Sequence, residues 1–151
     1  MMRRFLIPLG LSVLLIAPLA AQNQTEHRGV REAVLDYVEG VYAMKPERIA
    51  RSVHPTLVKQ GMVREGNAES YRGPIMMDYQ QLYDLAATWN RDNRNADPDT
   101  APKVVEVYDV QDATAIAKLT AVWGTDYFLL AKLDGKWMIM QVLWQSPVKR
   151  R

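Results

Sequence analysis

Hydrophobic residues recur at helical spacing between residues 30 and 41. Val30, Val34, Tyr37 and Val41 are three or four positions apart, so an α-helix would place them on one face. This spacing predicts an amphipathic helix with one buried side. Gly40 lies inside this helix, where glycine costs about 1 kcal/mol relative to alanine. We therefore expect another part of the backbone to lie close to Gly40.

Two further helices are predicted downstream. Pro46 suits a first helical position, and the segment that it opens ends before Pro55. A third helix is predicted over 75–90, because its apolar residues form one broad stripe. The stretch 90–102 is polar, aperiodic and rich in turn-forming residues, which indicates one long loop.

Strand-like segments make up the remainder of the chain. Residues 57–65 and 68–73 are expected to form a hairpin. Four more strands are separated only by tight turns, as in an antiparallel meander: Lys103–Val110, Ala113–Trp123, Thr125–Leu133 and Lys136–Gln145. Helices followed by consecutive strands indicate an α+β domain. We expect a cone-shaped half-barrel, a curved antiparallel sheet with three N-terminal helices packed in its concave face.

The last strand is apolar on both sides. In a regular extended chain one side of this strand would carry Trp137, Ile139 and Leu143. The opposite side would carry Met138, Met140, Val142 and Trp144. We expect the Trp137 side to face the helices. The second set would form a convex patch too apolar to remain in water, which predicts a homodimer through this face.

The N-terminus has the layout of a secretory signal peptide. Arg3 and Arg4 precede an uncharged apolar segment that ends at the small pair Ala20 and Ala21. The segment is short for a bilayer span and no second one follows, so no stable membrane span is expected. The expected divisions are a signal peptide at 1–21, a flexible segment at 22–29, one domain at 30–146 and a basic tail at 147–151. The expected location is periplasmic or secreted.

Charge and composition exclude several classes of function. Removing the signal peptide takes away two of 19 basic residues, so 17 remain against 17 acidic ones, and no electrostatic footprint for nucleic acid is left. The chain has no cysteine, which excludes disulfides and a cysteine nucleophile. Its two histidines, His27 and His54, do not suggest a metal site. No motif for a phosphate or another cofactor is present, so none is expected.

Several motifs resemble one known family. They are the helix ending in "DYVEGVY", the "HP" at His54 and Pro55, "A-x-A-K" at 115–118, "DY-x-x-L" at 126–130 and "DGKW-x-I" at 134–139. In this order they resemble the putative lumazine-binding family, part of the nuclear transport factor 2-like (SnoaL-like) superfamily that also includes ketosteroid isomerase. The resemblance covers most of the chain after residue 30. It implies a cone-shaped α+β barrel, often dimeric through the outer sheet face, usually with a small-molecule pocket.

Aromatic residues are the best candidates to line such a pocket, because they offer stacking faces and a few polar tips. The candidate ligand-binding residues are Tyr37, His54, Tyr79, Trp89, Tyr127 and Trp137. They would suit a small apolar or aromatic ligand.

Candidates for catalysis are His54 and Tyr37, and the catalytic residues are otherwise unknown. His54 could act as a general base, although its place before proline also suits a structural contact with a helix end. Tyr37 could donate a hydrogen bond to an enolate oxygen. A base is harder to find. Four aspartates near predicted turns are interpreted as turn formers: Asp109, Asp112, Asp126 and Asp134. Asp78 is placed in the first turn of a helix, where the helix dipole favours an acidic residue.

Three functions remain open from the sequence. The first is an exported, homodimeric protein that binds a small, largely apolar ligand. The second is a cofactor-independent isomerase, cyclase or dehydratase that acts on a small apolar substrate. The third is an assembly module with a vestigial pocket.

Overall fold

The fold is taken from a computed structural model, which describes residues 16–66 and 68–148, with side chains from residue 21 onward. The predicted flexible segment at 22–29 is helical, because the first helix extends well beyond the predicted start at Val30. The described helices are α1 (Ile16–Tyr42), α2 (Pro46–Ser52), α3 (Tyr79–Thr88) and the short 3-10 helix η1 (Arg91–Asn93). Most of the predicted signal peptide and the end of the basic tail lie outside the described residues.

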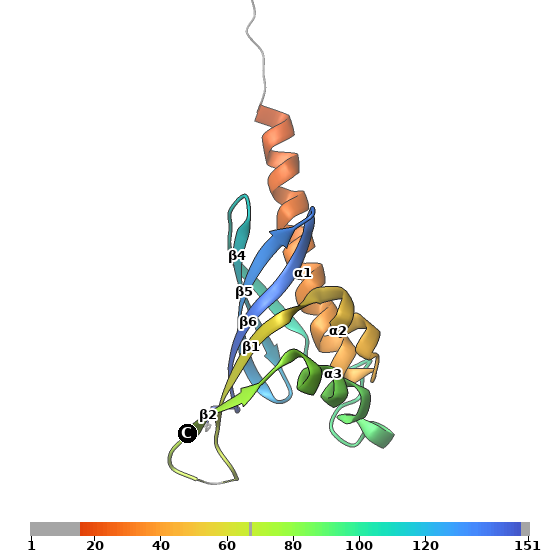
Figure 1. Ribbon diagram of the computed structural model, residues 1–151, viewed down its shortest axis with the longest axis vertical. Coiled ribbons are helices and arrows are strands. Elements are labelled where there is room, and N and C mark those ends of the chain that lie inside the picture. Colours follow the sequence, from red (N-terminus) through yellow and green to blue (C-terminus); the bar gives the residue numbers. More distant parts are fainter. Residues whose placement is uncertain (1–15, 67, 149–151) are drawn as a thin grey trace, which may run out of the picture.

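The strands form a single six-stranded sheet in the order β2-β1-β6-β5-β4-β3. They are β1 (Val53–Val63), β2 (Arg72–Met77), β3 (Val104–Val110), β4 (Thr114–Ala121), β5 (Gly124–Leu133) and β6 (Lys136–Gln145). The three α-helices lie on the same side of this curved, unclosed sheet (Figure 1). The expected α+β cone is therefore present.

The sheet is mixed, whereas the sequence predicted an antiparallel one. β1 pairs with β6 in parallel, and the other neighbours are antiparallel. The two parallel strands are joined by α3, the long loop and the rest of the sheet, a connection long enough to permit parallel pairing. Local hydrophobic patterns carry no information about this pairing.

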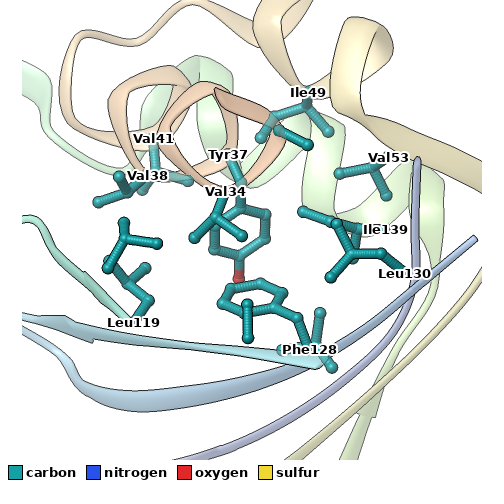
Figure 2. Close-up of a cluster of buried hydrophobic side chains, with 14 of the residues drawn as sticks. Val34, Tyr37, Val38, Val41, Ile49, Val53, Leu119, Phe128, Leu130 and Ile139 are labelled. Carbon is teal, nitrogen blue, oxygen red and sulfur yellow. The ribbon is translucent and has the colours of Figure 1, made fainter. Parts of the chain in front are cut away.

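The buried face of α1 forms the centre of the core. Val30, Val34, Tyr37 and Val41 are at most 3% exposed, as the predicted helical spacing requires. Figure 2 shows Tyr37 reaching from α1 toward Phe128, with aliphatic side chains on both sides. The Tyr37 and Phe128 ring centroids are 5.2 Å apart, with an edge-to-face orientation.

Gly40 allows α1 to pack closely against the segment that follows it. A Cβ atom at this position would lie 3.2 Å from both Arg48 Cβ and Ile49 Cδ1. The Lys45 amide donates a hydrogen bond to the Gly40 carbonyl at 2.8 Å. The close backbone approach expected from the sequence is confirmed.

α3 begins later than predicted, because Asp78 caps it. The Asp78 carboxylate accepts a hydrogen bond from the Gln81 amide at 2.8 Å, and the Gln81 side chain accepts one from the Asp78 amide at 2.9 Å. This reciprocal pair fixes the first turn of the helix. Residues 75–77, predicted to be helical, belong to β2 instead.

The two faces of β6 differ from the prediction because the strand contains a β-bulge. Leu129 pairs with Gln141 and Leu130 with Ile139, which leaves Met140 as an extra residue between them. An extra residue shifts the alternation by one position, so side chains after the bulge change faces.

The bulge places two of the four predicted interface residues inside the molecule. Val142 is 2% exposed, and Trp144 lines an internal cavity with the helices. Leu143, expected inside, is 50% exposed on the outer face. Met138 and Met140 are half-buried. The predicted convex patch is therefore wrong in its composition.

An apolar surface nevertheless exists on the outer face of the sheet. Cross-strand pairs place Tyr127 beside Leu143 and Ile116 beside Leu129, and Val58 is 44% exposed on β1. Together these residues line a shallow groove that crosses β1, β6, β5 and β4. We call it the outer groove, defined by Val58, Ile116, Tyr127, Leu129 and Leu143.

The predicted loop at 90–102 is held by one buried side chain. Asn90 is fully buried, and its amide nitrogen donates hydrogen bonds to the Tyr42 and Ala96 carbonyls at 2.7 and 2.8 Å. Its side-chain oxygen accepts bonds from the Asn95 and Ala96 amides at 3.1 and 3.0 Å. Because all four bonds are satisfied, the loop packs against the end of α1 as a fixed part of the domain.

Candidate functional site

A small cavity lies between the helices and the inner face of the sheet. Its volume is about 90 Å³. α1, α3, β1, the end of β2, the turn after β4 and the end of β6 all contribute to its walls. The apolar lining consists of Val41, Met77, Leu82, Leu85, Trp89, Trp123 and Trp144. Several of these residues are only half-buried, so the cavity has a mouth at the surface.

Two polar side chains line this otherwise hydrocarbon cavity, Lys59 and Tyr37. Lys59 is on the inner face of β1 and is 4% exposed, and Tyr37 is 1% exposed on α1. Lys59 Nζ donates a hydrogen bond to the Tyr37 hydroxyl oxygen at 2.5 Å. An ammonium group has three donors, and this is the one hydrogen bond of Lys59 Nζ among the described residues. The remaining donor capacity is available to a bound molecule.

Asp126 supplies the opposite charge behind the cavity. Its Oδ1 lies 3.8 Å from Lys59 Nζ, close enough for an ion pair but too far for a hydrogen bond. The Trp123 indole donates to Asp126 Oδ2 at 2.9 Å. Oδ1 is shielded from solvent and has no hydrogen-bond partner among the described residues. Asp126 itself is fully buried and does not line the cavity.

Aromatic rings flank the lysine. Lys59 Nζ lies 5.3 Å from the centroid of the Trp144 ring, within range of cation–π attraction. It meets Tyr37 at the hydroxyl, beyond the edge of the ring. The Trp144 ring lies over Gly61, where an added Cβ would be 2.3 Å from Trp144 Cε2. Glycine at 61 is therefore required for Trp144 to form this wall.

Burial controls the protonation of the three polar groups. It lowers the pKa of Lys59 and raises the pKa of Asp126, and in each case the charge of the other residue opposes the shift. Burial, reinforced by the negative charge of Asp126, holds the pKa of Tyr37 well above its usual value. Tyr37 therefore keeps its proton at neutral pH. Since its oxygen already accepts from Lys59, its O–H is a donor.

The chemistry that this site offers is hydrogen-bond donation into an apolar space. Lys59 and Tyr37 are adjacent donors, and the described lining contains no carboxylate and no histidine. A carbonyl, carboxylate or enolate oxygen fits these donors. A ligand that must itself donate a hydrogen bond would find no charged acceptor in the described lining.

Two of the residues proposed from the sequence line this cavity, Tyr37 and Trp89. Tyr79 is half-buried on α3 and packs against Tyr83, with the ring centroids 6.3 Å apart. His54 follows α2 at the start of β1, where its Nδ1 is 2.8 Å from Thr56 Oγ1. Neither Tyr79 nor His54 is part of the cavity lining.

The other two predicted residues lie in different parts of the fold. Tyr127 is 45% exposed and belongs to the outer groove. Trp137 is buried at the opposite end of the sheet, where its indole donates to Glu26 on α1 at 2.9 Å. Lys132 also bonds Glu26, at 2.6 Å. This contact ties α1 to the β5–β6 hairpin, which is a structural role.

Sequence analysis missed Lys59, and it interpreted Asp126 as a turn former. One signal for Lys59 was present: Leu57, Lys59 and Gly61 alternate on one face of β1 between outward-facing residues. A lysine on the buried side of a strand is unusual and often functional. Asp126 gave no such signal, since an aspartate close to a tight turn is ordinarily explained by the turn itself.

Residues 16–66 and 68–148 contain neither a metal-binding cluster nor a membrane-spanning helix. No group of three or more histidine or acidic side chains in these ranges is arranged to hold a metal ion. In the same part of the chain, no helix combines the length and apolar character needed to cross a membrane.

Comparison with solved structures shows which fold this is. The chain is similar to a nuclear transport factor 2-like protein of unknown function from Shewanella baltica OS155, with a TM-score of 0.60 and 18% identity over 83% of this chain and 97% of that one. A second such protein, from Silicibacter pomeroyi DSS-3, gives a TM-score of 0.57 and 14% identity over 88% and 99% of the two chains. A nuclear transport factor 2-like protein with a cystatin-like fold, from Novosphingobium aromaticivorans, gives a TM-score of 0.55 and 10% identity over 91% of this chain and 92% of that one. At these identities the likeness shows the fold alone.

The sequence comparisons give the family. No curated protein matches the chain. The family model described as "Putative lumazine-binding" matches residues 25–145, which include all of the domain core and the cavity. The protein therefore belongs to the putative lumazine-binding family, and its fold is that of the nuclear transport factor 2-like proteins.

Proposed function

We propose that this protein binds a small, largely apolar ligand through a carbonyl or carboxylate oxygen. The observation that carries the proposal is the pair of buried donors, Lys59 and Tyr37, at the wall of a hydrocarbon-lined cavity. Burying a lysine is costly, and a structural role would be served equally by an apolar side chain. An acceptor oxygen of the ligand would use donor capacity that the domain leaves unused.

The dimensions of the cavity limit the buried part of the ligand. Its volume is about 90 Å³. An engineered protein cavity that binds benzene is larger, at about 150 Å³. The enclosed part of the ligand is therefore an acyl group or part of one ring, and the rest lies in the mouth. Trp89, Trp123 and Trp144 would contact its faces.

The test compares two probes of similar shape, acetophenone and ethylbenzene. Acetophenone has a carbonyl group where ethylbenzene has a methylene group. Ligand-observed NMR should show that acetophenone binds at least about tenfold more tightly, the factor equivalent to one hydrogen bond of about 1.4 kcal/mol. Lys59→Met combined with Tyr37→Phe removes both donors and should abolish this preference, and Lys136→Met, at an exposed position, should leave it unchanged. Equal binding of both probes to the unaltered protein would contradict the proposal.

The site favours binding over the alternative isomerase function. An enolisation mechanism needs a base beside the substrate as well as a donor. Tyr37 could be the donor, but the nearest carboxylate, Asp126, has its free oxygen shielded behind Lys59. His54, the other candidate, is not in the lining.

We further propose that the protein is a homodimer through the outer groove. Its five apolar side chains are 42–50% exposed and contiguous across four strands. Burying this area against a second copy would remove it from water. Sedimentation velocity should show a dimer for the unaltered protein and a monomer for Leu143→Glu, because a charge on each copy would be desolvated. Val148→Glu, at an exposed site outside the groove, is the control.

Export remains a proposal that rests on the N-terminal sequence. Residues 21–25 are exposed, and among the described side chains of α1 the first that bonds the sheet is Glu26. Cleavage after residue 21 would leave the domain contacts intact. Expression with the full N-terminus, followed by mass spectrometry of the periplasmic fraction, should find a chain that begins near residue 22. A full-length chain in the cytoplasm would contradict this.

A further inference from the structure

We propose that Lys59 captures an aldehyde or ketone ligand covalently, as an imine at its Nζ. This inference rests on the proposed function, because it concerns the same cavity and the same ligand oxygen. It adds a chemical step that hydrogen bonding alone does not require.

The amine of Lys59 lies next to the position that a ligand's carbonyl carbon would occupy. Lys59 Nζ is in the wall of the cavity, at the end of a side chain that is 5% exposed and held between the Tyr37 and Trp144 rings. A carbonyl oxygen that accepts a hydrogen bond from Tyr37 would bring its carbon next to Nζ, since these two protein atoms are 2.5 Å apart. Proximity of this kind replaces a bimolecular encounter.

The nucleophile in imine formation is the neutral amine, and the site provides a path for the ammonium proton. The Tyr37 oxygen, 2.5 Å from Nζ, can accept that proton while its own O–H proton passes to the ligand oxygen. Burial lowers the pKa of Lys59, which makes loss of the proton easier than it is in water. Asp126 Oδ1, 3.8 Å from Nζ, is the counter-ion and is too far away to take the proton directly.

The step balances with these groups alone. A proton of the Lys59 ammonium passes to the Tyr37 oxygen, to which it is hydrogen-bonded at 2.5 Å, while the Tyr37 O–H proton passes to the carbonyl oxygen. The freed lone pair of Nζ attacks the carbonyl carbon, and the C=O electron pair moves to the protonated oxygen. A second proton of Nζ follows the same path to this hydroxyl, which leaves as water as the C=N bond forms. Overall, an ammonium ion and a carbonyl compound give an iminium ion and one water molecule.

The surroundings that hold the ammonium also suit the product. An iminium ion carries the same single positive charge at the same nitrogen. It would retain the Asp126 counter-ion at 3.8 Å and the Trp144 ring at 5.3 Å. The hydrocarbon lining excludes most water, which would otherwise hydrolyse the C=N bond.

The test uses propanal with cyanoborohydride, which reduces an imine to a stable propylamine. Peptide mass spectrometry at pH 7 measures the rate of labelling at each lysine. Lys59 should be labelled at least about tenfold faster than the exposed Lys136, because the cavity holds the carbonyl carbon next to Nζ. Labelling of Lys59 at the same rate as Lys136, or more slowly, would overturn the proposal.

Two variants separate the chemistry from folding. Lys59→Arg keeps a cation between the rings but cannot form an imine, so it should fold and remain unlabelled at position 59. Tyr37→Phe keeps the ring packing and removes the proton donor, so labelling of Lys59 should slow about 100-fold, the lower end of a positioned acid's contribution. An unchanged rate in Tyr37→Phe would remove Tyr37 from the step.

The outcome is distinguishable from failure of the proposed function. If acetophenone binds more tightly than ethylbenzene but propanal does not label Lys59, the covalent step is wrong and the binding site stands. If neither result is obtained, both proposals are wrong.

Discussion

The buried pair of Lys59 and Asp126 gives the sharpest test of the structural reasoning. The two side chains are 5% and 0% exposed, and their charged atoms are 3.8 Å apart. Removing one charge of such a pair leaves the other buried and uncompensated, which typically costs about 3–5 kcal/mol. We expect losses of this size in the free energy of unfolding for Lys59→Met and, separately, for Asp126→Asn.

The double variant should be less damaging than the sum of its parts. Asn at 126 can still accept the hydrogen bond of the Trp123 indole, and Met at 59 fills nearly the same volume as lysine. With no charge left to desolvate, the double variant should lose only about 1–2 kcal/mol, since neutralising both members of a buried pair is often nearly neutral. The coupling from this cycle would be several kcal/mol.

The pH dependence supplies a second readout. Lys59→Met leaves Asp126 with a pKa raised by burial and without the opposing lysine. The folded state then holds this proton more tightly than the unfolded state, so stability should fall as pH rises from the ordinary carboxyl pKa through the raised one. Asp126→Asn in the same background should abolish the dependence.

Urea denaturation followed by tryptophan fluorescence measures all four proteins. If each single variant loses less than about 1 kcal/mol and the two losses simply add, the pair is not a buried ion pair, and the description of the site is wrong.

Three more substitutions test the elements that build the cavity. Gly61→Ala should lower the free energy of unfolding by about 1–3 kcal/mol and weaken acetophenone binding, because its Cβ would overlap the Trp144 ring. Combining it with Trp144→Phe should recover part of this stability, and no recovery would refute the overlap. Asn90→Ala should lose at least about 3 kcal/mol in urea denaturation, since it removes four hydrogen bonds to backbone groups, of which three are buried and one is half-buried; a loss below about 1 kcal/mol would contradict this. Asp78→Ala should lose about 1 kcal/mol and increase hydrogen exchange at the start of α3, where the reciprocal cap is lost; unchanged exchange there would argue against the cap.

The sequence predicted the elements well wherever the pattern is local. The spacing from Val30 to Val41 specified the buried face of α1, and the turns between the last four strands specified a meander that pairs as expected. The family resemblance, read from short motifs in order, agrees with the family model over residues 25–145. Helix periodicity and turn chemistry are properties of neighbouring residues, so they can be read without the fold.

The same reasoning failed at β6, because strand alternation is only as reliable as the register. One extra residue at Met140 exchanged the faces of the residues after it, which moved Trp144 into the cavity and Leu143 onto the surface. A bulge is specified by the pairing with β5 and not by the composition of β6. For this reason the proposed dimer surface is the outer groove and not the predicted convex patch.

The sequence alone determined the class of fold, the order of most elements and the family, because these follow from local periodicity and recurrent motifs. The tertiary structure alone decided the site. Lys59, Tyr37 and Asp126 come from β1, α1 and β5, and they meet only because β1 pairs in parallel with β6 while α1 packs across the sheet. Long-range pairing places Lys59 in an apolar interior, and that burial lowers its pKa.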